Sequence, residues 1–186
     1  MPRIIKLLPL MLLLVLSACA ESIWASDEAV TKFSYSNNEP PSITLVTVIN
    51  NNNGSGGHSA LLINAHERVI FDPAGNFKSS FAPERNDFVY GITPAVLKTY
   101  YGFHARKAWH VVTQKVIVTP EIAEMVYNAT KNYGAVPKAM CSISVTNILR
   151  KIPGFETIPR TAFPKTIMKA FAKLPGVITD KIYEYD

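Results

Sequence analysis

The stretch from Gly56 to Gly75 constrains the fold most, because it predicts a β-hairpin with a polar residue at each end. Its two apolar runs, residues 59–63 and 68–72, are rich in branched and aliphatic side chains and are joined by a short polar segment, which is typical of paired strands. His58 stands at the entrance of the first strand and Asp72 at the exit of the second. The hairpin therefore brings an imidazole and a carboxylate toward each other.

The register of this hairpin decides how the two polar residues meet. A turn centred on Ala65 places His58 directly opposite Asp72, with Cβ atoms about 4.5–5.5 Å apart. At that distance the carboxylate can hold the ring in one tautomer and stabilise the imidazolium. We therefore predict His58 as a base that Asp72 orients. A different register would move the two side chains relative to each other. The alternatives are a surface histidine and an aspartate that only forms the turn before Pro73.

Cys141 stands at or just before a predicted helix whose apolar stripe contains Val145, Ile148, Leu149 and Ile152. A cysteine at a helix N-terminus lies beside unpaired N–H groups and the positive end of the helix dipole, which favours the thiolate. A nearby imidazolium lowers the thiol pKa further, and the same N–H groups can stabilise an oxyanion. This combination indicates acyl transfer through a thioester. The alternative is a buried, inert cysteine that packs as a small apolar side chain.

The remaining pattern predicts an α+β fold. Further strands are expected over residues 43–49 and 109–118, and helices are expected over residues 94–101, 120–133 and 164–174. We expect one antiparallel sheet, formed by strands that begin near Ser42, Ser59, Arg68 and Trp109 and packed on the helices that begin at Pro120 and Cys141. Residues 50–57 and 76–90 are expected to be loops.

The first 18 residues have the layout of a secretory signal peptide, with basic residues, a short apolar run and then small residues. The run is too short to span a bilayer, which needs roughly 20 residues. Leu16-Ser17-Ala18-Cys19 resembles the lipobox of bacterial lipoproteins, in which the cysteine is acylated and becomes the mature N-terminus. The resemblance implies membrane attachment through Cys19. Ala20 in the next position resembles lipoproteins forwarded to the outer membrane, on its periplasmic face, in hosts with two membranes. Ordinary cleavage after Ala20 is the alternative.

Three parts are therefore expected: a signal peptide over 1–18, a lipid anchor and flexible tether over 19–41, and one domain over 42–186. The net charge falls from +5 to +3 when Arg3 and Lys6 leave with the signal peptide. Such a mild charge argues against nucleic-acid binding.

The other histidines make a weak case for a metal site. His104 and His110 are an even number of residues apart and can share a strand face, but neither has a carboxylate or cysteine at ligand spacing. His66 lies in the predicted turn and is expected to be exposed. We therefore expect no metal and no other cofactor.

The order of a histidine on one strand, a polar residue on the next and a cysteine opening a later helix resembles the circularly permuted papain-like enzymes. These include permuted relatives of the NlpC cell-wall peptidases and the lecithin:retinol acyltransferase group. The matching pieces lie within residues 43–154 and comprise Gly57–Ile63, Val69–Asp72, and Tyr133 followed by Met140-Cys141-Ser142 and Ile148-Leu149.

This resemblance implies a permuted papain-like domain in which Cys141 is the nucleophile, His58 the base and Asp72 the orienting residue. Family members often carry histidine, glutamate or another polar group at the third position. The resemblance implies an amidase or endopeptidase acting on cell-wall peptides, or a hydrolase or acyltransferase acting on acyl lipids. The alternative function is a non-catalytic lipoprotein that uses the same fold to bind or scaffold envelope components.

Overall fold

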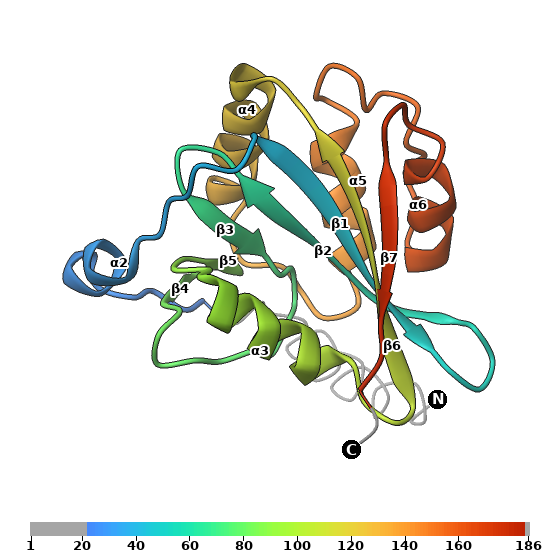
Figure 1. Cartoon of the computed structure of the whole chain (residues 1–186), viewed down its shortest axis with the longest axis horizontal. Helices are drawn as coiled ribbons and strands as arrows, with labels where there is room; N and C mark the ends of the chain where they lie inside the picture. The colour runs from blue at the N-terminus through green and yellow to red at the C-terminus, as the bar shows by residue number, and fades with distance from the viewer. Residues whose placement is uncertain (1–21, 185–186) are drawn as a thin grey trace, which may run out of the picture.

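The computed structural model of the chain describes residues 22–184 (Figure 1). These residues form one antiparallel sheet of seven strands and five helices, which confirms the expected α+β class. The predicted signal peptide and Cys19 lie outside the described residues. Within the described part of the chain, no helix is long and apolar enough to cross a membrane.

The sheet has the strand order β4-β5-β3-β2-β1-β6-β7. Its strands are β1 (Ser42–Asn50), β2 (Gly56–Asn64), β3 (Arg68–Phe71), β4 (Glu84–Arg85), β5 (Phe88–Val89), β6 (Trp109–Ile117) and β7 (Ile178–Ile182). The interior strand β1 is buried on both faces, as its unbroken β-branched run predicts. The four expected strands are present. β4 and β5 lie in a segment expected to be a loop, because two residues are too few to show an alternating pattern.

The helices are α2 (Asp27–Phe33), α3 (Pro94–His104), α4 (Pro120–Lys131), α5 (Cys141–Leu149) and α6 (Pro164–Phe171). Thr93 and Thr119 cap α3 and α4 through their hydroxyl groups, and a proline follows each cap. This arrangement is the one that their sequences predict.

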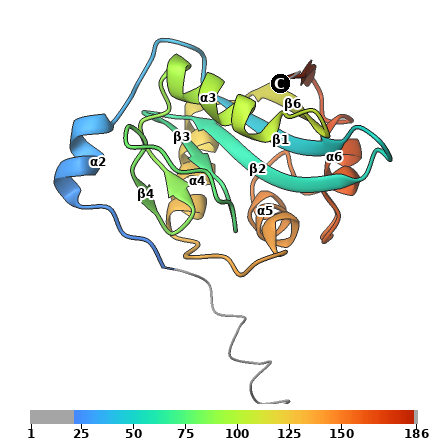
Figure 2. The same cartoon turned by 90° about the horizontal axis from the view of Figure 1, so that it is seen from below.

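The helices cover both faces of the sheet (Figure 2). One core lies between the sheet and α4, α5 and α6, and the other lies between the sheet and α3. On β2 and β3 the odd-numbered residues, such as Leu61 and Phe71, enter the first core. The even-numbered residues, such as Leu62 and Ile70, enter the second. Because side chains alternate along a strand, an even-numbered position on this hairpin faces α3.

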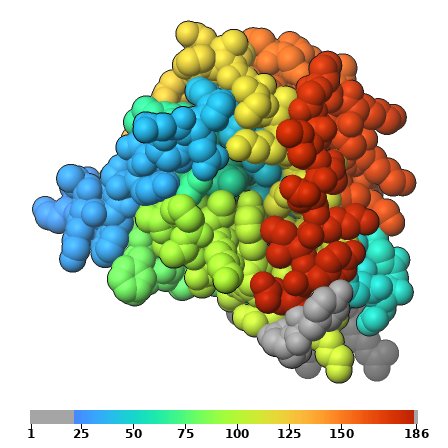
Figure 3. All heavy atoms as spheres, in the orientation of Figure 1, coloured from blue at the N-terminus to red at the C-terminus, as the bar shows by residue number. Residues whose placement is uncertain are grey.

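Residues 22–41 differ from the flexible tether that their polar composition indicates. They contain α2, and their backbone bonds to distant parts of the domain. The N–H of Ala25 donates to the carbonyl of Glu84 (3.0 Å), and the N–H of Arg68 donates to the carbonyl of Tyr35 (2.7 Å). These partners come from β3 and β4, so only the folded domain makes the segment ordered. In Figure 3, α2 projects from one end of the molecule, and the C-terminal segment with β7 covers the other end.

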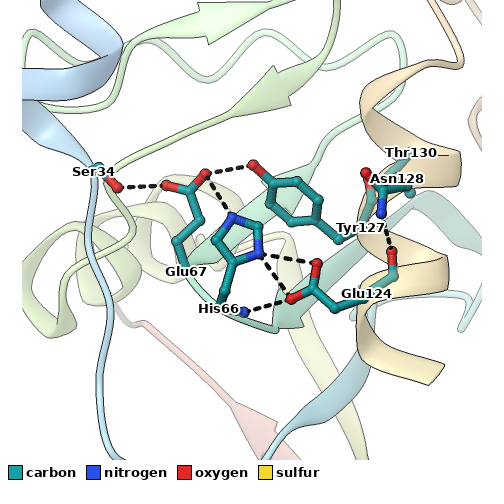
Figure 4. Close-up of polar contacts among 7 residues, drawn as sticks. All are labelled: Ser34, His66, Glu67, Glu124, Tyr127, Asn128 and Thr130. Atoms are coloured by element: carbon teal, nitrogen blue, oxygen red, sulfur yellow. Dashed lines mark hydrogen bonds and ion pairs between the residues drawn. The ribbon is translucent and has the colours of Figure 1, made fainter. Parts of the chain in front are cut away.

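A polar cluster joins this N-terminal segment to the hairpin turn and to α4 (Figure 4). The buried Glu67 carboxylate accepts hydrogen bonds from the hydroxyl groups of Ser34 (2.7 Å) and Tyr127. The neighbouring His66 pairs with Glu124 at 2.8 Å, and its side chain is 58% exposed. The expected exposure of His66 is thus confirmed, and its role here is to connect the turn to α4.

Removing the Tyr127 hydroxyl should destabilise the fold. The Tyr127→Phe variant leaves one oxygen of a buried carboxylate without that donor, which costs about 1–3 kcal/mol. Chemical denaturation followed by circular dichroism measures the change. The matched control is Tyr133→Phe, whose more exposed hydroxyl only accepts a hydrogen bond from Asn147. Equal stabilities for the two variants would contradict this role of Tyr127.

Candidate active site

The β2–β3 hairpin turns around His66 and not around Ala65. Leu61 pairs with Phe71, and Asn64 pairs with Arg68. The predicted register, with His58 directly opposite Asp72, is therefore wrong. Asp72 follows the last paired residue of β3 and lies diagonally from His58. The sequence placed the turn one residue too early because a polar turn of this kind does not indicate which of its residues is central.

His58 and Asp72 nevertheless meet. The register differs from the predicted one by two residues on one strand, and residues two apart point to the same face of a sheet. Diagonal neighbours on one face also remain within reach of long side chains. His58 Nε2 lies 2.7 Å from Asp72 Oδ1, and the two side chains are 15% and 4% exposed. The predicted contact is thus present on the α3 face of the hairpin.

Cys141 reaches this pair where the hairpin opens. β3 ends at Phe71, so β2 pairs with it only from Leu61 onward. Beyond that point the Cys141 thiol lies close enough to the His58 side chain and to the Ser59 main chain for both to favour its thiolate. A further contact, 3.3 Å between the hydroxyl groups of Ser59 and Ser142, holds the start of α5 against β2.

The three predicted residues therefore form a continuous series of contacts from Asp72 through His58 to Cys141. No known protein-family model matches this chain, and no curated protein or solved structure matches it significantly. Its function is therefore inferred from its own residues and their geometry.

Helix α3 adds two residues to this pair: Tyr100, which the sequence pattern did not single out, and His104, which it grouped with His110 instead. The Tyr100 hydroxyl donates to Asp72 Oδ1 at 2.8 Å. The His104 ring stacks on the His58 ring, with centroids 5.4 Å apart and planes inclined by 18°. Tyr100 and His104 are four residues apart and so share one face of α3. This spacing was a usable signal, but the expected helix ended at Tyr101, before His104.

The His58–Asp72 pair is strongly polarised. Burial lowers the pKa of His58, but the charge and hydrogen bond of Asp72, with a smaller contribution from Cys141, outweigh it and raise the pKa to about 10. Burial raises the pKa of Asp72, but the His58 charge and hydrogen bond, aided by His104 and Tyr100, hold that pKa below its ordinary value. At neutral pH the pair is therefore an imidazolium and a carboxylate.

The pKa values of Cys141 and His104 are shifted in the directions expected beside a charged His58–Asp72 pair. Burial opposes ionisation of Cys141, yet hydrogen bonding and charge from His58, followed by the Ser59 N–H, lower its pKa overall. Burial lowers the pKa of His104 to about 4, with Asp72 opposing this shift and the His58 charge adding to it. His104 is therefore a neutral ring beside a charged one.

Asp87 ties the loop before Cys141 to the segment that carries Asp72. It lies in the tight turn between β4 and β5 with a positive φ of 67°. Its carboxylate accepts the Val136 N–H at 2.7 Å, and its carbonyl accepts the Asp72 N–H at 2.8 Å. Burial raises the pKa of Asp87, against the main-chain hydrogen bonds it accepts. Asp87 thus connects the loop that precedes α5 to the end of the hairpin.

A cleft of about 1110 Å³ adjoins the site. Its walls include His58, His104, Phe103 and Trp109, whereas Cys141 is 8% exposed and is not among the residues that line it. The glycine before His58 allows this close packing, since a Cβ at Gly57 would lie 2.6 Å from the Trp109 ring. The cleft therefore gives access to the imidazole side of the site.

The structure also changes the grouping of possible metal ligands. His104 ends α3 and His110 lies on β6, so they do not share a strand face as expected. Instead, His104 joins His58 and Asp72, and one ligand atom from each lies within 4.8 Å of the others. The carboxylate that the local sequence lacks comes from the hairpin.

Proposed function

We propose that this chain is a cysteine-dependent acyl hydrolase or acyltransferase with a permuted papain-like domain. Cys141 is the nucleophile, His58 the general acid and base, and Asp72 the residue that orients His58. The observation that carries the proposal is the 2.7 Å His58–Asp72 contact beside Cys141, with the pKa of His58 raised and that of Cys141 lowered.

The chemistry follows from a thiolate next to an imidazolium. The Cys141 sulfur attacks a carbonyl carbon and forms a thioester, while the leaving amine or alcohol takes the proton from His58. Water, or another acceptor, then gives a proton to His58 and attacks the thioester. This second step releases the acyl group and restores the thiolate and imidazolium. Asp72 keeps its charge throughout and holds the ring in place.

The start of α5 is suited to stabilise the oxyanion of this reaction. Met140 precedes Cys141 at the cap position and makes no side-chain capping hydrogen bond. The N–H groups of the first turn lack partners within the helix. They carry the positive end of the helix dipole and can donate to a negatively charged oxygen.

The charges of the cleft favour a substrate with an anionic group. Lys78, Arg106 and Lys138 line it together with Glu84 and Asp87. Glu84 pairs with Lys78 at 2.5 Å, so these two charges offset each other, and the walls carry one more basic than acidic side chain. A cell-wall peptide with a free carboxylate suits such a cleft. An acyl lipid with an anionic head group is the second candidate.

We further propose that the protein is an envelope lipoprotein acylated on Cys19, at the periplasmic face of the outer membrane in a host that has one. Ile23 lines the cleft, and the Asn86 N–H donates to its carbonyl at 2.9 Å. Four residues span at most about 14 Å. A lipid on Cys19 would therefore keep the cleft close to the membrane surface, where both substrate classes occur.

The pH dependence of Cys141 alkylation tests the proposed nucleophile. We expect iodoacetamide to label the metal-free parent with a midpoint below the free-thiol pKa of about 8.5. In His58→Ala the midpoint should rise by about 1–3 pH units, because the thiolate loses its neighbouring positive charge. Peptide mapping by mass spectrometry reports Cys141 separately from Cys19.

The matched control for this experiment is His66→Ala, which removes an exposed histidine outside the site. It should leave the midpoint unchanged. A parent midpoint at or above the free-thiol value, with no response to His58→Ala, would rule out Cys141 as the nucleophile.

That negative outcome would favour a non-catalytic lipoprotein that binds or scaffolds envelope components. The observation that favours this non-catalytic function is the burial of Cys141, which is 8% exposed and does not line the cleft. A buried cysteine without an activating partner reacts slowly. The alkylation profile therefore separates the two functions directly.

A further inference from the structure

Three side chains of types that ligate metals converge beside the cleft: His58, Asp72 and His104. One ligand atom from each lies within 4.8 Å of the other two. They come from β2, from the residue after β3 and from the last turn of α3, so only the fold brings them together. Both histidine rings line the cleft, which gives an ion a path to the cluster.

His104 has an atom whose position the proposed hydrolase does not explain. Its Nε2 is buried and has no hydrogen-bond partner among residues 22–184. Buried polar atoms in proteins are normally paired. The ring is held in place by edge contacts with Tyr100 and Phe103 at 4.7 and 5.0 Å and by stacking on His58. A fixed imidazole nitrogen without a partner is suited to bind a metal ion.

The spacing of the three groups matches a small ion. Ligand atoms about 2.0 Å from a tetrahedral ion lie about 3.3 Å from one another. The separations here, 2.7 Å for His58 Nε2 to Asp72 Oδ1 and at most 4.8 Å within the set, lie on either side of that value. Small side-chain rotations therefore suffice. The Tyr100 hydroxyl, bonded to Asp72 Oδ1, would hold the carboxylate in place.

We propose that His58, Asp72 and His104 form a binding site for a divalent transition-metal ion, with zinc as the best match. Two imidazoles and one carboxylate suit Zn²⁺ or Co²⁺, whereas Mg²⁺ and Ca²⁺ favour oxygen ligands. The ion takes the place of the proton that lies between His58 and Asp72. A fourth ligand, such as water, approaches from the cleft. Cys141 is not a ligand, but the ion would occupy the position of the His58 proton that the proposed hydrolase uses, so metal binding and acid–base catalysis exclude each other at this site.

A rival cluster on the surface has to be separated from this one. His66 lies 2.8 Å from Glu124 and 3.8 Å from Glu67. Its side chain is well exposed, and its Nδ1 is already paired with Glu124. His66 is therefore the matched control for a surface histidine that can bind zinc weakly without a preorganised set of ligands.

The test is calorimetric titration of Zn²⁺ into the full chain in detergent after treatment with a chelator, together with the absorption spectrum of added Co²⁺. The parent should bind one ion. His104→Gln and Asp72→Asn should each weaken binding by at least about 10-fold, whereas His66→Ala should bind as the parent does. Ca²⁺ should not bind at this site. Circular dichroism checks that each variant is folded, and the two ligand variants provide independent readouts.

Retained binding in Cys141→Ala supports the three proposed ligands and excludes a thiolate site. The proposal is overturned by a parent that does not bind Zn²⁺, or by His104→Gln binding as tightly as the parent. Loss of binding in His66→Ala or Cys141→Ala, with retention in His104→Gln, overturns it as well. The alkylation profile is measured on metal-free protein, so failure of the metal site and failure of the hydrolase are seen separately.

Discussion

Replacing Asp72 by asparagine should lower the pKa of His58 from about 10 to the ordinary histidine value or below. The substitution removes the negative charge that stabilises the imidazolium but leaves the burial that opposes it. Asparagine is close in size and still accepts a hydrogen bond from Tyr100. Loss of the imidazolium at neutral pH should reduce acyl transfer by roughly 10²–10⁴-fold, the usual contribution of general acid–base catalysis. Histidine C–H resonances followed by NMR as a function of pH measure the shift.

The same variant changes how stability depends on pH. The raised pKa of His58 contributes stability that is complete below about 6.5 and is lost as the pH rises toward about 10. The lowered pKa of Asp72 contributes stability above its unfolded value, which is lost as the pH falls through the folded value. In mildly acidic solution, the free energy of unfolding of the parent should therefore be about 1–3 kcal/mol higher than that of Asp72→Asn. This difference should shrink as the solution becomes alkaline.

The control for Asp72→Asn is Asp180→Asn, which alters an exposed aspartate on β7. It should leave both the His58 titration and the stability profile unchanged. If His58 still titrates near pH 10 in Asp72→Asn, the carboxylate is not what holds its proton.

Replacing Gly75 by alanine should produce the same functional loss without altering a reacting group. A Cβ at Gly75 would lie 1.8 Å from Asp72 Oδ2 and 2.3 Å from Cγ, so the carboxylate must move away. The His58–Asp72 hydrogen bond should then be lost, and the pKa of His58 should fall as it does in Asp72→Asn. We expect a loss of about 100-fold in acyl transfer and a cost of about 1–3 kcal/mol in stability.

A second glycine offers the matched control. Gly102 lies in α3, and the nearest atom to an added Cβ there is Glu184 Oε1 at 3.8 Å, an ordinary contact. Gly102→Ala should therefore keep the His58 titration and gain up to about 1 kcal/mol from helix propensity. NMR titration and chemical denaturation follow both variants. A Gly75→Ala protein with an unchanged His58 pKa would show that Asp72 tolerates the added methyl group.

Local signals explain which elements the sequence predicts well. Thr93 and Thr119, each followed by proline, mark the starts of α3 and α4, because a cap and its helix are neighbours in the chain. The β-branched run of β1 indicates a buried strand for the same reason. By contrast, β4 and β5 have two residues each, and β7 is exposed along most of its length. Their pairing depends on partners elsewhere in the chain, so no local pattern reveals them.

The hairpin shows how far such signals reach. Alternation has a period of two, so the face shared by His58 and Asp72 was predicted correctly even though the register was wrong by two residues. The exact register depends on the turn and on packing against both layers of helices. Local alternation thus accounts for the shared face of His58 and Asp72, whereas the tertiary packing decides their diagonal geometry.

The sequence by itself determined the α+β class, the two principal strands of the hairpin and the contact between His58 and Asp72. Only the tertiary structure placed Cys141 and the start of α5 against β2, and brought Tyr100 and His104 to Asp72. The physical reason is the distance along the chain over which each kind of interaction acts. Caps, turns and alternation act over a few residues, but the position of a helix on a sheet depends on how both surfaces pack, which no local pattern encodes.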